Sequence, residues 1–274
     1  MIGVKRKQRS SSEGTVQSSD QIAQSAPRND RAWWGPLLGV GFLLLLFIAP
    51  EFVVFPFAYA VHMASGGAGT YDAFTGWITT TAGNTWYVAL TDLVILAIVG
   101  LIVYKKRSTL NGLGLGKGAW RQLGLATVFF LAYILVYLLV ISVVSALVPG
   151  FDVEQERDIG FNDLRGVVQM SVVFVLLVVI TPIVEEIMFR GFLFRGFRKK
   201  MPFWLATALT SLVFGAVHLT SLGDSAPVWV AALDTGLLSV ALCVAREYSK
   251  SLWPAIYMHG AKNALAFVFL YLVH

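Results

Sequence analysis

The chain has few charges and a single cysteine, and both shortages exclude whole classes of protein. Of its 274 residues, 14% are charged and 57% are hydrophobic, with a mean hydropathy of +0.70. Soluble globular domains have about 25% charged and about 45–50% apolar residues. These charges are too few to cover a water-facing surface of this size, which excludes an ordinary soluble enzyme. Because Cys243 has no second cysteine to pair with, a disulfide scaffold is excluded as well. The composition indicates a polytopic membrane protein.

Long apolar runs predict an all-α bundle of about seven transmembrane helices. A helix needs about 20 mostly apolar residues to cross the hydrocarbon core. The first run carries Pro50, Glu51 and Pro56, which predict a kink or a break, and an eighth span hidden there is the alternative. The seven segments are Gly35–Val61, Trp86–Tyr104, Leu123–Val148, Val167–Val184, Phe203–Leu219, Ala226–Ala245 and Leu252–Val273.

The basic residues behind the net charge of +5 are unevenly distributed along the chain. Lys and Arg gather in the N-terminal tail and in alternate connecting segments, whereas the other connections hold only Arg157 and Arg165. By the positive-inside rule this pattern predicts a cytoplasmic N-terminus, and seven crossings would place the C-terminus outside. The excess charge is therefore expected to face the bilayer surface, and no nucleic-acid partner is expected.

Ionisable side chains are costly at bilayer depth, so each one is a candidate functional group. The first cluster is Glu185-Glu186-Ile-Met-Phe-Arg190. Glu186 and Arg190 are four residues apart, which favours an ion pair along one helix face. Glu185 points about 100° away and has no counter-ion nearby in sequence. A buried glutamate in that position is suited to accept a proton, which predicts a general base. Pro182 is expected to bend the helix one turn earlier.

Two further clusters repeat the four-residue spacing. Phe214 and His218 share one face of a helix in which Gly215 permits a close helix approach. His259 and Asn263 share another face and could bind a metal or donate to an oxyanion.

These clusters are predicted to meet. With a turn at residues 200–202, Glu185 and His218 both lie roughly 21–24 Å from it, on antiparallel helices. The site would then lie inside the membrane, toward the cytoplasmic side.

The remaining polar residues at depth have simpler interpretations. Asp92 and Asp234 are expected to hold helices together or to pair with Lys262. Glu51 is expected to mark the break in the first span. Lys262 lies beside Asn263, so it could bring a cation into the site, pair with Asp234 or Glu186, or reach the interface.

The three clusters resemble the CPBP family of intramembrane proteases, which includes type II CAAX prenyl endopeptidases and Abi-type bacteriocin self-immunity proteins. The family's E-E-x-x-x-R, F-x-x-x-H and H-x-x-x-N/D motifs occur here in the same order, and the likeness covers roughly residues 167–272. The resemblance implies hydrolysis of a peptide bond in a membrane-associated or prenylated peptide. It implies that Glu185 and His218 activate water, that His259 and Asn263 stabilise the oxyanion, and that Glu186, Arg190 and Phe214 support the site.

Several alternatives stay open. The enzyme could be a glutamate-type protease that needs no metal, or a metalloprotease with Glu185, His218 and His259 as zinc ligands. The His-Glu-x-x-His zinc motif is absent from the sequence. A non-catalytic immunity or scaffold protein keeps the fold without the chemistry, and a proton-coupled transporter also uses Glu and His at depth.

The sequence predicts three regions. A disordered, basic and Ser-rich cytoplasmic tail spans residues 1–34, N-terminal transmembrane helices span 35–165, and a CPBP-like catalytic core spans 166–274. Expected partners are a peptide or membrane-protein substrate and the lipid bilayer. The expected location is a bacterial plasma membrane.

Overall fold

The described part of the chain is all helical, which confirms the predicted fold class. The computed structural model describes residues 32–116, 122–155, 161, 163–164, 166–219 and 227–273. No strand occurs among these residues. The predicted tail lies outside them except for Ala32, Trp33 and Trp34. Both Ala32 and Trp34 are buried in the core.

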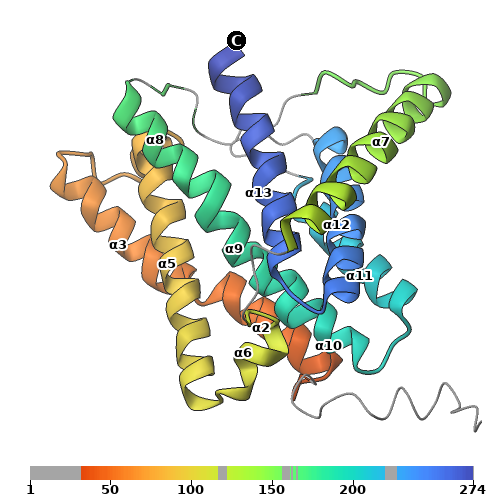
Figure 1. The fold of residues 1–274 in the computed structure, drawn as a ribbon. Helices are drawn as coiled ribbons and strands as arrows, with labels where there is room; N and C mark the ends of the chain where they lie inside the picture. The colour runs from red at the N-terminus through yellow and green to blue at the C-terminus, as the bar shows by residue number, and fades with distance from the viewer. Residues whose placement is uncertain are drawn as a thin grey trace, which may run out of the picture.

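The helices follow the predicted apolar segments (Figure 1). In order they are α2 (Pro36–Ile48), α3 (Glu51–Ala64), α4 (Tyr71–Ile78), α5 (Thr81–Lys105), α6 (Ser108–Leu113), α7 (Leu123–Leu147), α8 (Val167–Val175), η3 (Leu176–Ile180), α9 (Thr181–Glu186), η4 (Ile187–Phe194), α10 (Arg195–Arg198), α11 (Phe203–Ala216), α12 (Trp229–Ser249), α13 (Trp253–Val268) and η5 (Phe269–Val273).

Five helical segments are long and apolar enough to cross a membrane: Pro36–Ala64, Thr81–Lys105, Leu123–Leu147, Val167–Arg198 and Trp229–Ser249. Large apolar side chains cover much of their outer surface, among them Leu37, Leu135 and Val168. The protein is therefore an integral membrane protein. The predicted span at Phe203–Leu219 is shorter than expected, because its helix α11 ends at Ala216 after 14 residues. The predicted number of about seven transmembrane helices is therefore only approximate, because five helical segments meet the length and hydropathy required of a span.

The prolines act where they were expected, although not always in the expected way. The first run is interrupted at Ala49 and Pro50, so that α3 starts at Glu51, as predicted. Pro182 was expected to bend its helix. The turns before it widen into the π-helix η3, in which Thr181 N–H donates to the Leu176 carbonyl, five residues back. A π-turn is one way for a helix to absorb a residue without a backbone donor.

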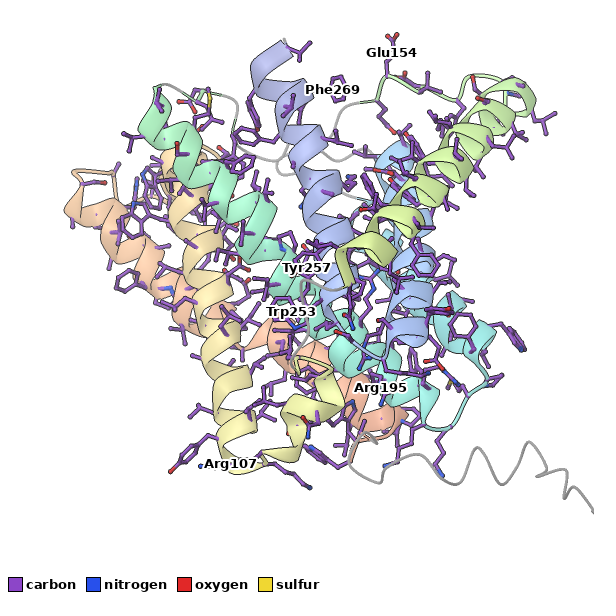
Figure 2. The ribbon with its side chains drawn as sticks, viewed as in Figure 1. Arg107, Glu154, Arg195, Trp253, Tyr257 and Phe269 are labelled. Carbon is purple, nitrogen blue, oxygen red and sulfur yellow. The ribbon has the colours of Figure 1, made fainter. Side chains whose placement is uncertain are left out.

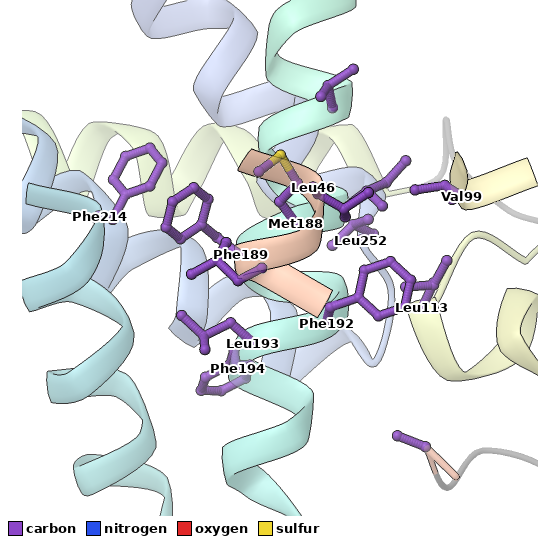
Figure 3. Packing of buried hydrophobic residues seen from close by; sticks show 14 of the residues in the cluster. Leu46, Val99, Leu113, Met188, Phe189, Phe192, Leu193, Phe194, Phe214 and Leu252 are labelled. Carbon is purple, nitrogen blue, oxygen red and sulfur yellow. The ribbon is translucent and has the colours of Figure 1, made fainter. Parts of the chain in front are cut away.

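The core surrounds η4, which runs through the centre of the molecule with all eight of its residues buried (Figure 3). Helix α2 crosses η4 closely, and the rings of Phe42 and Phe192 lie 4.7 Å apart. A Cβ built on Gly196 would lie 2.9 Å from the Gly35 carbonyl oxygen, so glycine is required where α2 meets α10. On the other side Gly215 lets α11 approach the Ala232 carbonyl of α12 in the same way, as its small size predicted.

Candidate active site

The two neighbouring glutamates of the first motif lie in different surroundings. Glu186 has no exposed side-chain surface and forms the predicted ion pair with Arg190, with 2.9 Å between Glu186 Oε1 and the arginine Nη1. The side chain of Glu185 is 25% exposed. Because the two residues point in different directions around the helix, the Glu186 side chain is enclosed, whereas the Glu185 side chain is partly exposed with its Oε2 atom buried.

His259 of α13 lies between these two carboxylates. Its Nδ1 is 2.9 Å from Glu186 Oε1, and its Nε2 is 3.7 Å from Glu185 Oε2. Glu185 was expected to be buried with no counter-ion nearby in sequence; its Oε2 atom is buried, although the side chain as a whole is partly exposed. Its partner comes from a helix 74 residues further along the chain, which packs against α9. A carboxylate on one ring nitrogen fixes the orientation and the proton position of a histidine.

Phe214 of the second motif connects His218 to the site around His259. Its ring packs 4.6 Å from His218 and 5.8 Å from His259, between ring centroids. The guanidinium of Arg190 lies 4.4 Å from the same ring centre, a cation–π contact. Phe189 of η4 packs edge-on against Phe214. Phe214 of α11 therefore contacts residues of η4 and α13 as well as His218 on its own helix.

The imidazole of His218 is oriented by its own helix. Its Nδ1 lies 2.7 Å from the Phe214 carbonyl oxygen, one turn back. A carbonyl only accepts hydrogen bonds, so Nδ1 carries the proton and donates. In the neutral ring the lone pair then lies on Nε2, which is the nitrogen able to accept a proton or to bind a metal.

Asn263 makes a contact that the sequence analysis did not foresee. Its Nδ2 donates to the Leu177 carbonyl oxygen of η3 over 2.9 Å. In a π-helix that carbonyl would accept from residue 182, but Pro182 has no N–H. One amide N–H of Asn263 therefore replaces the missing backbone donor, and only the second N–H of the amide is left for an oxyanion. The only trace of this contact in the sequence is that Pro182 lies in one motif helix and the Asn263 amide in another.

Three other polar residues at depth, Lys262, Asp234 and Asp92, have hydrogen-bonding or ionic partners. Lys262 pairs with Asp234 of α12, with 3.0 Å between Nζ and Oδ2, which is one of the pairings predicted from sequence. Asp234 also accepts a hydrogen bond from Tyr133 of α7. Asp92 accepts a hydrogen bond of 2.7 Å from Thr181, one turn before Glu185, and so joins α5 to α9. Both aspartates hold helices together, as expected.

The predicted zinc ligands are not gathered into a metal-binding group. Among the described residues, which include Glu185, His218 and His259, no three His, Cys, Asp or Glu side chains are placed to hold a metal ion. Cys243 is fully buried in α12, beside Arg190 and Ser239. The arrangement offers one partly exposed glutamate and two oriented imidazoles for acid–base chemistry.

Comparison with known proteins agrees with the motifs. Residues 167–265 match the family model described as type II CAAX prenyl endopeptidase Rce1-like. A shorter stretch of 71 residues is 38% identical to UPF0177 protein YbdI of Lactococcus lactis subsp. lactis strain IL1403, covering 26% of this chain and 38% of the relative's own length. No solved structure gives a significant match. The resemblance to type II CAAX prenyl endopeptidases is thereby confirmed for the part of the chain that carries all three motifs.

Proposed function

We propose that this protein is an intramembrane endopeptidase of the CPBP type, which hydrolyses a peptide bond in a membrane-associated or prenylated peptide. The observation that carries the proposal is the unequal pair of glutamates around one histidine. Glu186 is enclosed by Arg190 and His259, whereas Glu185 is 25% exposed and its buried Oε2 faces the other nitrogen of the same ring. The Rce1-like match over residues 167–265 supports a protease of this kind.

In the proposed reaction Glu185 is the general base. Its carboxylate takes a proton from water, and the water oxygen attacks the carbonyl carbon of the substrate. The C–N bond of the tetrahedral intermediate then breaks as the proton passes to the leaving amine. His218 assists through Nε2, because Nδ1 already donates to the Phe214 carbonyl. The second N–H of Asn263 stabilises the oxyanion, and His259 joins it through Nε2 when both ring nitrogens carry a proton, because Nδ1 already faces Glu186. Arg190, Glu186 and Phe214 hold the two imidazoles in place.

We propose the glutamate-type reaction rather than a metal-dependent one, because the residues present supply a base and two proton-bearing rings without further help. Histidine and carboxylate are nonetheless the usual ligands of a catalytic zinc. A chelator distinguishes the two: cleavage that is unchanged after prolonged treatment with a strong zinc chelator supports the glutamate type, and cleavage restored only by added zinc supports the metalloprotease.

The proposed division of the chain into three regions is the one predicted from its sequence. Residues 166–274 form the catalytic core, residues 35–165 are supporting transmembrane helices, and residues 1–34 are a cytoplasmic tail in a bacterial plasma membrane. The Rce1-like match lies entirely inside the first of these regions. The lipid bilayer and a peptide or membrane protein are the proposed partners.

The test is cleavage of a panel of plain and prenylated peptides by the purified full-length protein in detergent. Glu185→Gln is expected to lower the cleavage rate by at least about a hundredfold, since general bases contribute that much or more. The matched control is Glu154→Gln, the same chemical change at an exposed position, which is expected to cleave at the wild-type rate. Cleavage by folded Glu185→Gln at the wild-type rate would refute the proposal. Equal peptide binding without any cleavage would favour the non-catalytic immunity or scaffold function.

A further inference from the structure

A cavity of about 390 Å³ opens beside the end of the helix that carries the motif glutamates. The described residues that line it are Ala32, Arg195, Arg198, Lys199 and Lys200. We call it the basic cavity, because four of these five side chains are cationic. Its volume falls within the usual range of ligand pockets. The proposed protease mechanism uses none of these residues.

At the basic cavity two cations share one carboxylate, and a further lysine is held by a neutral acceptor. Arg198 pairs with Glu247 over 2.8 Å, but Glu247 is also 3.1 Å from Lys250, so two cations share one carboxylate. Lys199 donates to the Trp33 carbonyl oxygen over 3.0 Å. A carbonyl is a neutral acceptor, so this bond fixes the position of the ammonium group without cancelling its charge. The cavity is therefore suited to an anion.

The basic cavity lies at one end of the membrane-spanning helices. Arg198 is the last residue of the span Val167–Arg198. Figure 2 places Arg195 toward the same end of the molecule as Arg107, and Glu154 at the opposite end. Trp33, whose carbonyl holds Lys199, also donates from its indole N–H to the Thr109 hydroxyl. A tryptophan among lysines at a span end is typical of the level of the lipid headgroups.

We propose that the basic cavity binds the headgroup phosphate of an anionic phospholipid. The guanidinium of Arg198, whose Nη1 donates to the Met201 carbonyl and whose Nη2 donates to Glu247, would add positive charge close to the phosphate. Lys199 and Lys200, both exposed, would add charge at the rim. Basic pockets between transmembrane helices on the cytoplasmic side are a recurring way of binding such lipids. The headgroup level of the cavity favours a lipid over a soluble phosphate.

The test measures binding of three probes to the full-length protein in neutral detergent micelles by titration calorimetry. The probes are a short-chain phosphatidylglycerol, the phosphatidylcholine of the same chain length, and inorganic phosphate. The variant is Lys199→Gln with Lys200→Gln, which leaves the Arg198–Glu247 pair intact. The matched control is Lys105→Gln with Arg107→Gln, which removes two exposed cations outside the cavity lining. Circular dichroism and gel filtration verify that both variants are folded.

Saturable binding of phosphatidylglycerol is expected, with affinity lowered at least about tenfold in the cavity variant and less than about threefold in the control. Phosphatidylcholine is expected to bind at least about tenfold more weakly than phosphatidylglycerol, because its headgroup has no net charge. Equal losses in both variants would overturn the proposal, since they would indicate diffuse surface attraction. Inorganic phosphate binding as tightly as the lipid would overturn the assignment to a lipid, and absence of binding by all three probes would overturn the site. None of these readouts depends on protease activity.

Discussion

Two neighbouring glutamates, Glu185 and Glu186, have opposite surroundings, and each surrounding follows from the helix that packs against it. The Glu186–Arg190 pair could be predicted from sequence, because both partners lie on one helix with i,i+4 spacing. The place of His259 between the two carboxylates could not, since that contact spans 73 residues and depends on how α13 packs against α9. Local spacing identified the residues of the candidate site, and tertiary packing determines their partners.

The enclosed glutamate is predicted to be the one that stability depends on. Glu186→Gln leaves the Arg190 guanidinium buried without its counter-ion, and breaking such a pair costs about 3–5 kcal/mol of unfolding free energy. Glu185→Gln changes a partly exposed carboxylate and is expected to cost less than about 1 kcal/mol. Denaturant unfolding in detergent, followed by tryptophan fluorescence, compares the two. Equal stability of both variants would contradict the assigned environments.

The helix that carries the motif glutamates receives side-chain donors from other parts of the chain at both of its π-segments. Asn263 donates to Leu177 in η3, and the Trp34 indole N–H donates to the Phe192 carbonyl in η4 over 2.9 Å. Sequence patterns placed the apolar helix correctly, but propensity and spacing do not reveal a π-turn. A bend at Pro182 was the closest expectation available, because the missing N–H was visible and its replacement was not.

Pro182 and Asn263 are predicted to be energetically coupled. Asn263→Ala alone leaves the Leu177 carbonyl without the side-chain donor and is expected to cost about 1–3 kcal/mol. In a Pro182→Ala background the residue 182 N–H becomes available to the carbonyls of η3, so the same change should cost about 1 kcal/mol less. A double-mutant cycle of unfolding free energies measures this coupling. Identical costs of Asn263→Ala in both backgrounds would contradict it.

The crossing of α2 over α10 is predicted to be intolerant of any side chain at its closest point. Gly196→Ala places a Cβ 2.9 Å from the Gly35 carbonyl oxygen and 3.1 Å from the Gly39 Cα. Backbone must move, which typically costs about 1–3 kcal/mol. Gly41→Ala, in α2 with open space around it, is the matched control and is expected to be neutral or stabilising by up to about 1 kcal/mol. Thermal unfolding of both variants checks the difference.

In the molecule as a whole, the start of α2 and the C-terminus lie at opposite ends (Figure 1), with Arg107 and Glu154 likewise separated (Figure 2). The alternation of apolar and basic segments predicts this arrangement, because hydropathy and the distribution of Lys and Arg determine how helices insert into the membrane. The length of α11 was overestimated, because the apolar run Phe203–Leu219 continues beyond the point where the helix ends. Hydropathy alone does not determine where a helix stops.

The predicted orientation can be tested by labelling engineered cysteines. In a Cys243→Ser background, Glu154→Cys is expected to react with a membrane-impermeant maleimide in intact cells, because its end of the molecule faces outward. Arg107→Cys is expected to react only after the membrane is opened. Both side chains are exposed, so differences in burial do not confuse the comparison. The opposite labelling pattern would reverse the proposed cytoplasmic location of the N-terminus.

The π-segments also change how this helix tolerates the loss of a residue. A π-turn closes its hydrogen bond over one residue more than an α-turn does. Deleting one residue from η4 can therefore tighten a π-turn into an α-turn and leave the helical phase of α10 unchanged. The same deletion in the middle of α12 would rotate everything after it by about 100°. A one-residue gap between distant relatives within η3 or η4 is then a structural adjustment, whereas in α12 it would signal misalignment.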